Sequence, residues 1–315
     1  MAGGVEHELV ASLRADLDGW ERWLVYADWL IERGDVRGEL IALEHRLSVS
    51  ALADDERLSL RAQARALART HERGWLMGWV PPARSHLEWR YGFLVGLWLP
   101  WSTGTLAVLA ALVVHPVARL LVKLDLQHSA LGAGGARKLA ASPSLRALAT
   151  LDLRGTSSGD DGVAALAASD NLRSLTQLDL ESNNLGADGA AALAASDRLP
   201  SLRALNLSRN RLGCDGARAL AASASLSSLV ELDLSVNGIG IEGVRALATA
   251  DGLGSLARLD LRHNRFGADG ARALAASTSL RSLERLDLDG CLIGDEGRAA
   301  IAASEALRGV RCDGG

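Results

Sequence analysis

Apolar and polar positions alternate along this chain in a pattern that returns every 27 residues. Residues 175–199, LTQLDLESNNLGADGAAALAASDRL, show one complete unit. In its first half Gln177, Asp179 and Glu181 alternate with leucines, which is the period of a strand with one buried and one exposed face. The second half follows a glycine and is rich in alanine, a strong helix former. Each unit therefore predicts a strand, a turn and a short helix.

Seven units keep this phase without a slip. The central strand leucine recurs as Leu124, Leu151, Leu178, Leu205, Leu232, Leu259 and Leu286. A polar residue five positions later recurs as Ser129, Thr156, Asn183, Asn210, Asn237, Asn264 and Cys291. One unit of this length cannot bury its own apolar face, so identical units must stack around a shared core. We expect the polar residue to satisfy turn backbone groups that stacking removes from water, with Ser, Thr or Cys as weaker substitutes for Asn.

Residues 94–312 closely resemble the ribonuclease-inhibitor-like class of leucine-rich repeats, through the LDL strand and the LGxxGAxALA helix entry. The resemblance implies an α/β horseshoe, a solenoid with a parallel sheet on the concave side and helices on the convex side. Proteins of that class almost always use this surface to hold another protein. The resemblance thus implies a protein partner.

Both ends of the array depart from the pattern. Leu94 is in phase with Leu121, so we predict a degenerate first repeat whose apolar helix near 105–114 is buried under the N-terminal helices. Trp98 occupies an outward strand position, and we favour its packing under the N-terminal region over a role as an exposed binding anchor, with Trp101 similarly structural. At the other end the chain stops soon after Val310. We therefore predict eight parallel strands, with the last edge poorly closed or covered by a partner.

A sharp change of composition separates the first 92 residues from the repeats. All eight tryptophans lie within the first 101 residues. Helical spacing over 6–17, 20–34, 39–48 and 54–76 predicts a small helical domain, with Asp54 or Asp55 capping the last of these helices. The predicted organisation is a helical domain at 1–92 and a repeat domain at 93–315, the latter holding one degenerate and seven full repeats.

Residues 24–44, LVYADWLIERGDVRGELIALE, resemble the bacterial repeat-companion domain, a short module that precedes repeat arrays. The resemblance implies no chemistry. The segment holds a cluster of charged residues, Asp28, Glu32, Arg33, Asp35, Arg37 and Glu39. An acid/base centre is one interpretation of this cluster. We favour capping and ion pairs that fix the turn between two helices.

The balance of charge argues against a nucleic-acid partner. The 38 acidic residues slightly outnumber the 34 basic ones, for a net charge of −4, whereas nucleic-acid binding calls for a clustered basic excess. The N-terminus lacks a basic segment followed by an apolar one, and no apolar run reaches the length of a membrane span. Three cysteines without metal or disulfide spacing predict reduced thiols. We expect a cytoplasmic protein that does not contact membranes.

No sequence motif supports catalysis or a cofactor. The chain lacks GxSxG, a phosphate loop with GKS or GKT, HExxH, and a Cys–His pair at a useful spacing. His128 and His263 hold equivalent positions five repeats apart, or about 24 Å at about 4.8 Å per strand, so they cannot share a metal. We therefore predict a protein that is not an enzyme, with no catalytic residue, metal site or cofactor.

The function that remains is a non-catalytic protein-binding module that uses the concave face. The alternative is a regulator of an enzyme, such as a GTPase-activating or effector protein, since the Ran GTPase-activating protein shares this repeat class. The candidate partner-binding residues are the outward strand positions, Asp125, Asp152, Gln177, Asp179, Glu181, Asn206, Glu231, Asp233, Arg258, Asp260, Arg262 and Asp287. Two interpretations of the aspartate column stay open. Aspartate is either the soluble default of an LDL strand, or part of a mid-array acidic strip that receives a basic protein surface.

Overall fold

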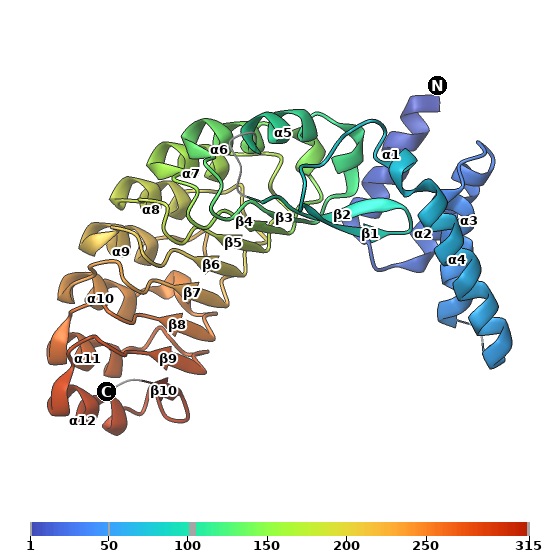
Figure 1. Ribbon diagram of the computed structural model, residues 1–315. Coiled ribbons are helices and arrows are strands. Elements are labelled where there is room, and N and C mark those ends of the chain that lie inside the picture. The colour runs from blue at the N-terminus through green and yellow to red at the C-terminus, as the bar shows by residue number, and fades with distance from the viewer. Residues whose placement is uncertain (1, 50, 101–104, 314–315) are drawn as a thin grey trace.

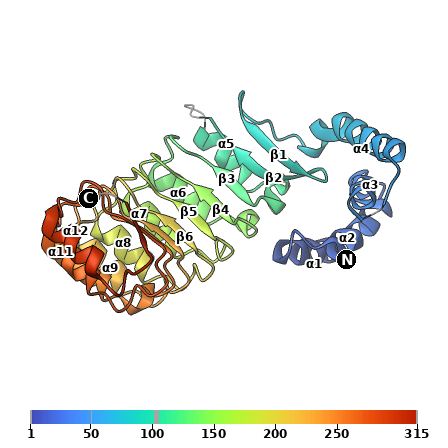
Figure 2. The same ribbon diagram turned by 90° about the horizontal axis from the view of Figure 1, so that it is seen from below.

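The repeats form an arch with helices on the outside and strands on the inside (Figure 1). This computed structural model describes residues 2–49, 51–100 and 105–313. A group of helices built from the N-terminal region stands at one end of the arch, and the last repeat lies at the other (Figures 1 and 2). The predicted α/β solenoid with an N-terminal helical region is confirmed.

The strands of the described residues form one sheet of ten, arranged in chain order. Their bounds are β1 His86–Arg90, β2 Phe93–Trp98, β3 Lys123–Asp125, β4 Thr150–Asp152, β5 Gln177–Asp179, β6 Ala204–Asn206, β7 Glu231–Asp233, β8 Arg258–Asp260, β9 Arg285–Asp287 and β10 Arg311–Asp313. From β2 to β9 the strands are parallel, and each residue pairs with the residue 27 positions away, as Leu151 does with Leu178. The last strand, β10, is also parallel but pairs with β9 at a spacing of 26 residues, as Cys312 does with Leu286. The repeat phase therefore sets the sheet register.

One short helix per repeat covers the convex side of the sheet (Figure 1). These helices are α5 Thr105–Leu112, α6 Gly132–Ala140, α7 Gly159–Ala167, α8 Ala187–Ala194, α9 Gly213–Ala221, α10 Ile241–Ala248, α11 Gly267–Ala275 and α12 Gly294–Ala303, with 3-10 turns at Pro116–Leu120, Pro143–Leu145 and Asp251–Leu253. Their leucines join the strand leucines in one continuous core. The helices pack closely: a Cβ built on Gly243 would lie 3.0 Å from the Cβ of Ala217 in the preceding helix. Small residues on the helices thus permit the tight stacking.

The predicted polar column forms a buried ladder between repeats. The Asn210 Oδ1 accepts hydrogen bonds from the backbone N–H groups of Asn183 and Leu185, at 2.9 and 3.0 Å. Its Nδ2 donates to the carbonyl oxygens of Leu180 and Leu207, both at 2.9 Å. Each ladder side chain therefore connects its own turn to the turn of the preceding repeat.

The substitutes in this column make fewer bonds, as predicted. The Cys291 thiol contacts the Leu261 carbonyl oxygen at 3.0 Å, and burial raises the pKa of that thiol to about 11. The buried Ser129 hydroxyl has no hydrogen-bond partner. The ladder is thus strongest in the middle of the array.

A second ladder, which the sequence analysis missed, is built from serines that follow the helices. Each serine hydroxyl donates to a carbonyl 29 residues earlier, over 2.5 to 2.6 Å, in Ser142, Ser169, Ser196, Ser223, Ser277 and Ser304. Ala250 occupies this position in the remaining repeat. The 27-residue spacing of these serines was visible in the sequence and could have identified them.

The N-terminal region folds into four helices, α1 Ala2–Ala15, α2 Trp20–Ile31, α3 Arg37–Val49 and α4 Asp54–Trp75. The core shared by α1, α2 and α3 is centred on Trp23 and Tyr26 and includes Phe93 and Leu120 from the start of the array, whereas α4 packs on α3 in a separate cluster. Two guanidinium groups stack on Phe93, with the Cζ of Arg37 at 4.5 Å and the Cζ of Arg119 at 5.3 Å from the ring centroid. Phe93 therefore joins the N-terminal helices to the first strand of the repeats.

Two predictions about this junction were wrong, namely the packing of the helix near 105–114 and the cap of α4. The helices dock on the Pro116–Leu120 turn, which contacts α1, whereas α5 packs on α6 and on the repeat core. Trp98 lies half-buried opposite His86 of β1, and Trp101 lies outside the described residues. The N-cap of α4 is Ala53, so neither Asp54 nor Asp55 caps it. The spacing of apolar residues predicts these helices, but it does not show which part of the chain each helix packs against.

The two ends of the sheet also differ from the prediction. Residues 86–90 form β1, an antiparallel partner of β2, so the stretch 1–92 is not wholly helical. At the other end β10 pairs with β9 through Cys312 and Leu286, which adds a ninth parallel strand to the eight predicted. A three-residue strand needs only backbone pairing, which explains why it forms without the missing leucine. The domain boundary at residue 93 stays a prediction.

Candidate partner-binding face

The concave face carries a groove of about 770 Å³ that crosses the strands from β4 to β10. The register places one outward column of carboxylates along it, because Asp152, Asp179, Asn206 and Asp233 pair in sequence. Nine of the twelve candidate residues line this groove, namely Asp152, Gln177, Asp179, Asn206, Glu231, Asp233, Arg258, Asp260 and Asp287. Glu181 and Arg262 line an adjoining hollow of about 220 Å³, and Asp125 lies beyond both, on β3. The fold thus brings eleven candidates into two adjoining hollows.

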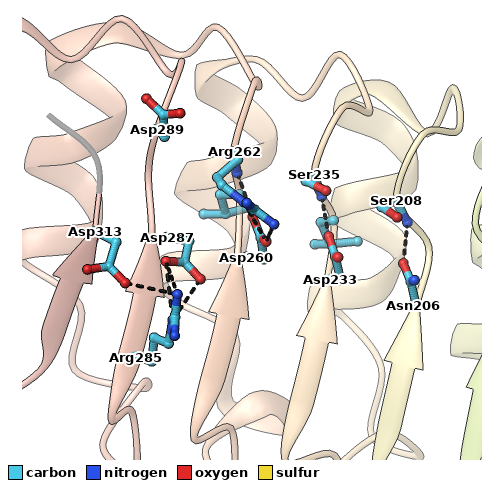
Figure 3. A network of polar contacts seen from close by, with 12 residues as sticks. Asn206, Ser208, Asp233, Ser235, Asp260, Arg262, Arg285, Asp287, Asp289 and Asp313 are labelled. Atoms are coloured by element: carbon cyan, nitrogen blue, oxygen red, sulfur yellow. Dashed lines mark hydrogen bonds and ion pairs between the residues drawn. The ribbon is translucent and has the colours of Figure 1, made fainter.

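The aspartate column also has a local structural role that the sequence analysis missed. The carboxylates of the column from Asp125 to Asp260 each accept a hydrogen bond from the backbone N–H two residues later, for example Asp179 from Glu181 at 3.0 Å and Asp233 from Ser235 at 2.8 Å. Asn206 makes the same contact with Ser208 at 2.9 Å (Figure 3). This is the Asx turn that favours Asp and Asn at the end of a strand. The column is therefore more than a soluble default, and its turn works with either residue.

Most arginines on the concave face are paired with these carboxylates. Arg154 contacts Asp152 at 2.6 Å, and Arg262 contacts Asp260 at 2.6 Å. Arg285 bridges Asp287 and Asp313 at 3.0 and 2.9 Å (Figure 3). Further ion pairs join Lys123 to Glu88, Arg209 to Glu181 and Arg258 to Glu231. Many of the groove's charges are thus already balanced within the chain.

Two mid-groove carboxylates are balanced poorly or not at all. Asp233 makes no ion pair with any described residue, and Asp179 has only a distant contact of 3.7 Å with Arg154. Burial, followed by the charge of Asp260, raises the pKa of Asp233, and burial raises the pKa of Asp179 in the same way. The folded chain therefore holds these two charges at a cost in stability, because a raised pKa means that folding disfavours the ionised form.

The concave face as a whole is acidic. Its outward positions from β3 to the chain end carry six cations, Lys123, Arg154, Arg258, Arg262, Arg285 and Arg311. They carry ten carboxylates, Asp125, Asp152, Asp179, Glu181, Glu231, Asp233, Asp260, Asp287, Asp289 and Asp313. The cations at strand positions gather toward the C-terminal strands, and in Figure 3 the Asp289 side chain stands apart from the bonded network. The middle of the groove is left acidic.

Other candidate chemistry has structural explanations. Asp35 accepts hydrogen bonds from the backbone and side chain of Arg37; although burial opposes ionisation, these bonds hold the pKa of Asp35 below its usual value. His128 and His263 have φ of 58° and 57°, and each packs against a glycine of the next repeat. Within the described residues, no group of three or more His, Cys, Asp or Glu is placed to hold a metal ion. None of the described helices combines the length and apolar character needed to cross a membrane.

Comparisons with known proteins agree with the repeat geometry. Six segments match the Leucine Rich repeat family, at residues 117–140, 171–194, 198–221, 225–248, 255–275 and 279–302. No curated protein matches the chain. Each matched segment contains one strand of the array and the helix that follows it, except for the last residue of α12, and the buried Asn ladder joins successive units.

Two solved structures show limited similarity to the chain. The complex of Rad7 and Elc1 from yeast has 14% identity and a TM-score of 0.36, covering 88% of this chain and 81% of its own. An internalin from Listeria monocytogenes has 19% identity and a TM-score of 0.35, covering 65% of this chain and 69% of its own. Scores this low carry no argument about partners. On the family matches and the repeated geometry, residues 117–302 carry leucine-rich repeats, and the chain has the fold of a leucine-rich-repeat solenoid.

Proposed function

We propose that this chain is a non-catalytic binding module that holds a protein partner in its concave groove. The observation that carries the proposal is a pair of half-buried carboxylates at the middle of a mostly ion-paired groove. Asp233 has no ion pair with any described residue, and Asp179 has only its distant contact with Arg154. Charges held at a cost to stability are typical of functional surfaces. A partner that brings cations to these positions would remove that cost. The preferred partner is therefore a protein with a basic surface.

The dimensions of the groove support a macromolecular ligand over a small one. Its lining runs across seven strands, or about 29 Å at about 4.8 Å per strand, and it is open along its length. Small-molecule sites are usually deeper and mostly apolar. Charge on such a surface sets the association rate and specificity more than the total affinity. The three free cysteines support a reducing compartment, which we propose is the cytoplasm.

Affinity capture tests this function. The full chain is immobilised and exposed to an extract of its native host, and bound proteins are eluted with increasing salt and identified by mass spectrometry. We expect proteins with basic surfaces, released as salt rises, because salt screens partly exposed charges. Capture that does not depend on salt would contradict an electrostatic groove, and capture of nothing above an uncoated control would contradict the binding function.

A further inference from the structure

A line of arginines on α4 is left unused by the function proposed above. Arg57, Arg61, Arg65, Arg69 and Arg73 recur at every fourth position of this 22-residue helix. The last four are exposed, and no described carboxylate lies within ion-pair distance of any of them. Most arginines of the repeats are paired, so this line, which we call the arginine stripe, is unusual in the molecule. Unpaired and aligned cations on one helix require an explanation.

Packing fixes the direction in which the arginine stripe points. The buried side of α4 holds Leu60, Ala64 and Trp75, of which Ala64 and Trp75 pack with Leu40 of α3. With 3.6 residues per turn, a four-residue step advances about 40° around the helix, so the stripe winds from the flank of α4 to the face opposite this contact. Ala62 and Ala66 lie beside the stripe and add little bulk. The exposed face of α4 can therefore approach another surface closely.

The charges along α4 are the reverse of those along the groove. The helix begins with three acidic residues, Asp54, Asp55 and Glu56, and continues with the arginine stripe. The cations of the groove, Arg258, Arg285 and Arg311, lie on β8 to β10. Its weakly paired or unpaired carboxylates lie nearer to β3. If the first turn of such a helix lay over β9, its three carboxylates would lie beside the arginines of β8 to β10. This position would also place the arginine stripe over the acidic strands.

The lengths agree as well. Arg61 and Arg73 are separated by twelve residues, or about 18 Å along the helix at about 1.5 Å per residue. Asp233 on β7 and Asp125 on β3 are separated by four strand spacings, or about 19 Å. A polyanion such as DNA would fit the stripe but would meet the acidic first turn of α4 as a repulsive charge. The bipolar pattern matches this groove better.

We infer that α4 of one copy of this chain docks on the concave face of a second copy, along the groove and the neighbouring strand β3, with the arginine stripe over the carboxylates of β3 to β7. Within one chain this contact is not made, because α4 stands apart from the groove strands in both views (Figures 1 and 2). In this contact a helix lies along a groove of an identical chain and is held by complementary charge. It rests on the proposed function, since it names a second copy as one basic partner of the groove.

Two variants separate the two sides of the contact. Arg65→Glu with Arg69→Glu reverses the stripe, and both positions are exposed on α4. Asp179→Asn with Asp233→Asn neutralises the groove while keeping the turn acceptor, as Asn206 shows. Sedimentation equilibrium of the full chain is measured at low and high salt, with circular dichroism to check that each variant is folded. We expect the wild type to self-associate at low salt, and either double variant to do so roughly tenfold or more weakly.

Mixing the two variants gives the decisive result. The stripe variant keeps an intact groove and the groove variant keeps an intact stripe, so together they should form a complex that neither forms alone. A wild-type chain that stays monomeric overturns the inference, even if the stripe then binds double-stranded DNA. The proposed function of the groove would in that case still be tested by the affinity capture. Self-association that is lost in the stripe variant but kept in the groove variant also overturns the inference, since the stripe would then dock on a surface other than the groove. In that case groove binding fails for this partner alone.

Discussion

Replacing Asp179 and Asp233 with asparagine is expected to weaken binding of a basic protein partner by roughly a hundredfold while leaving the fold intact. A close charge pair at an interface contributes about 1.5 kcal/mol or more, and about 1.4 kcal/mol is a factor of ten in affinity. Asparagine keeps the oxygen that accepts the backbone N–H, as Asn206 does in the same column. The substitution therefore removes charge and preserves the turn. Titration calorimetry with the captured partner measures the loss.

The convex surface supplies a matched control. Asp161 on α7 and Asp215 on α9 are exposed and pair with Arg137 and Arg218. Replacing both with asparagine removes the same net charge from the opposite side of the molecule. An equal loss of affinity in this control would show that overall charge, and not the groove, governs binding.

Stability should respond in the opposite direction to binding. The pKa values of Asp179 and Asp233 are raised in the folded chain, chiefly by burial. Their protonated forms therefore stabilise the fold below the unfolded pKa, and this contribution is lost as pH rises through the folded pKa. At neutral pH both groups are ionised at a cost. The neutral asparagines should leave the unfolding midpoint unchanged or slightly higher, while partner affinity falls.

Replacing Asn210 with alanine is expected to lower the free energy of unfolding by at least about 3 kcal/mol. The side chain accepts from two buried backbone N–H groups and donates to the carbonyls of Leu180 and Leu207. Each buried polar group left without a partner costs about 1–3 kcal/mol. Urea unfolding followed by circular dichroism measures the change, and amide exchange should rise first in the turns at Asn183 and Asn210. The exposed Gln177→Ala is the control, and equal effects in the two variants would remove the ladder from the account of stability.

The repeat phase in the sequence was enough to predict most of the array. A fixed 27-residue step determines which residues become neighbours, so the strand register and the role of Asn183 and Asn210 followed directly. The Asp and Ser columns also recur every 27 residues, but their roles depend on the conformation of backbone turns, which the spacing does not give. The Asx turn at Asp179 and the serine ladder at Ser223 were therefore overlooked, although their spacing was visible.

Contacts between different parts of the chain could not be predicted in this way. Phe93 meets Arg37 and Arg119 because three elements converge, and no periodicity links these positions. The β1 hairpin forms on the exposed edge of β2, which local pattern alone does not reveal. The outward positions of the candidate site were predicted residue by residue. Their ion pairs, and hence the exceptional state of Asp233, required the structure.

Site-specific photocrosslinking tests the central claim most directly. A photoreactive amino acid is placed at Gln177, exposed on the concave strand β5, or at Ala191, exposed on the convex helix α8 of the same repeat. Each labelled chain is mixed with the native extract and illuminated, and crosslinked proteins are identified by mass spectrometry. We predict that position 177 crosslinks to the captured partner and position 191 does not. Crosslinks formed from position 191 alone would place the partner on the convex surface and contradict binding in the concave groove.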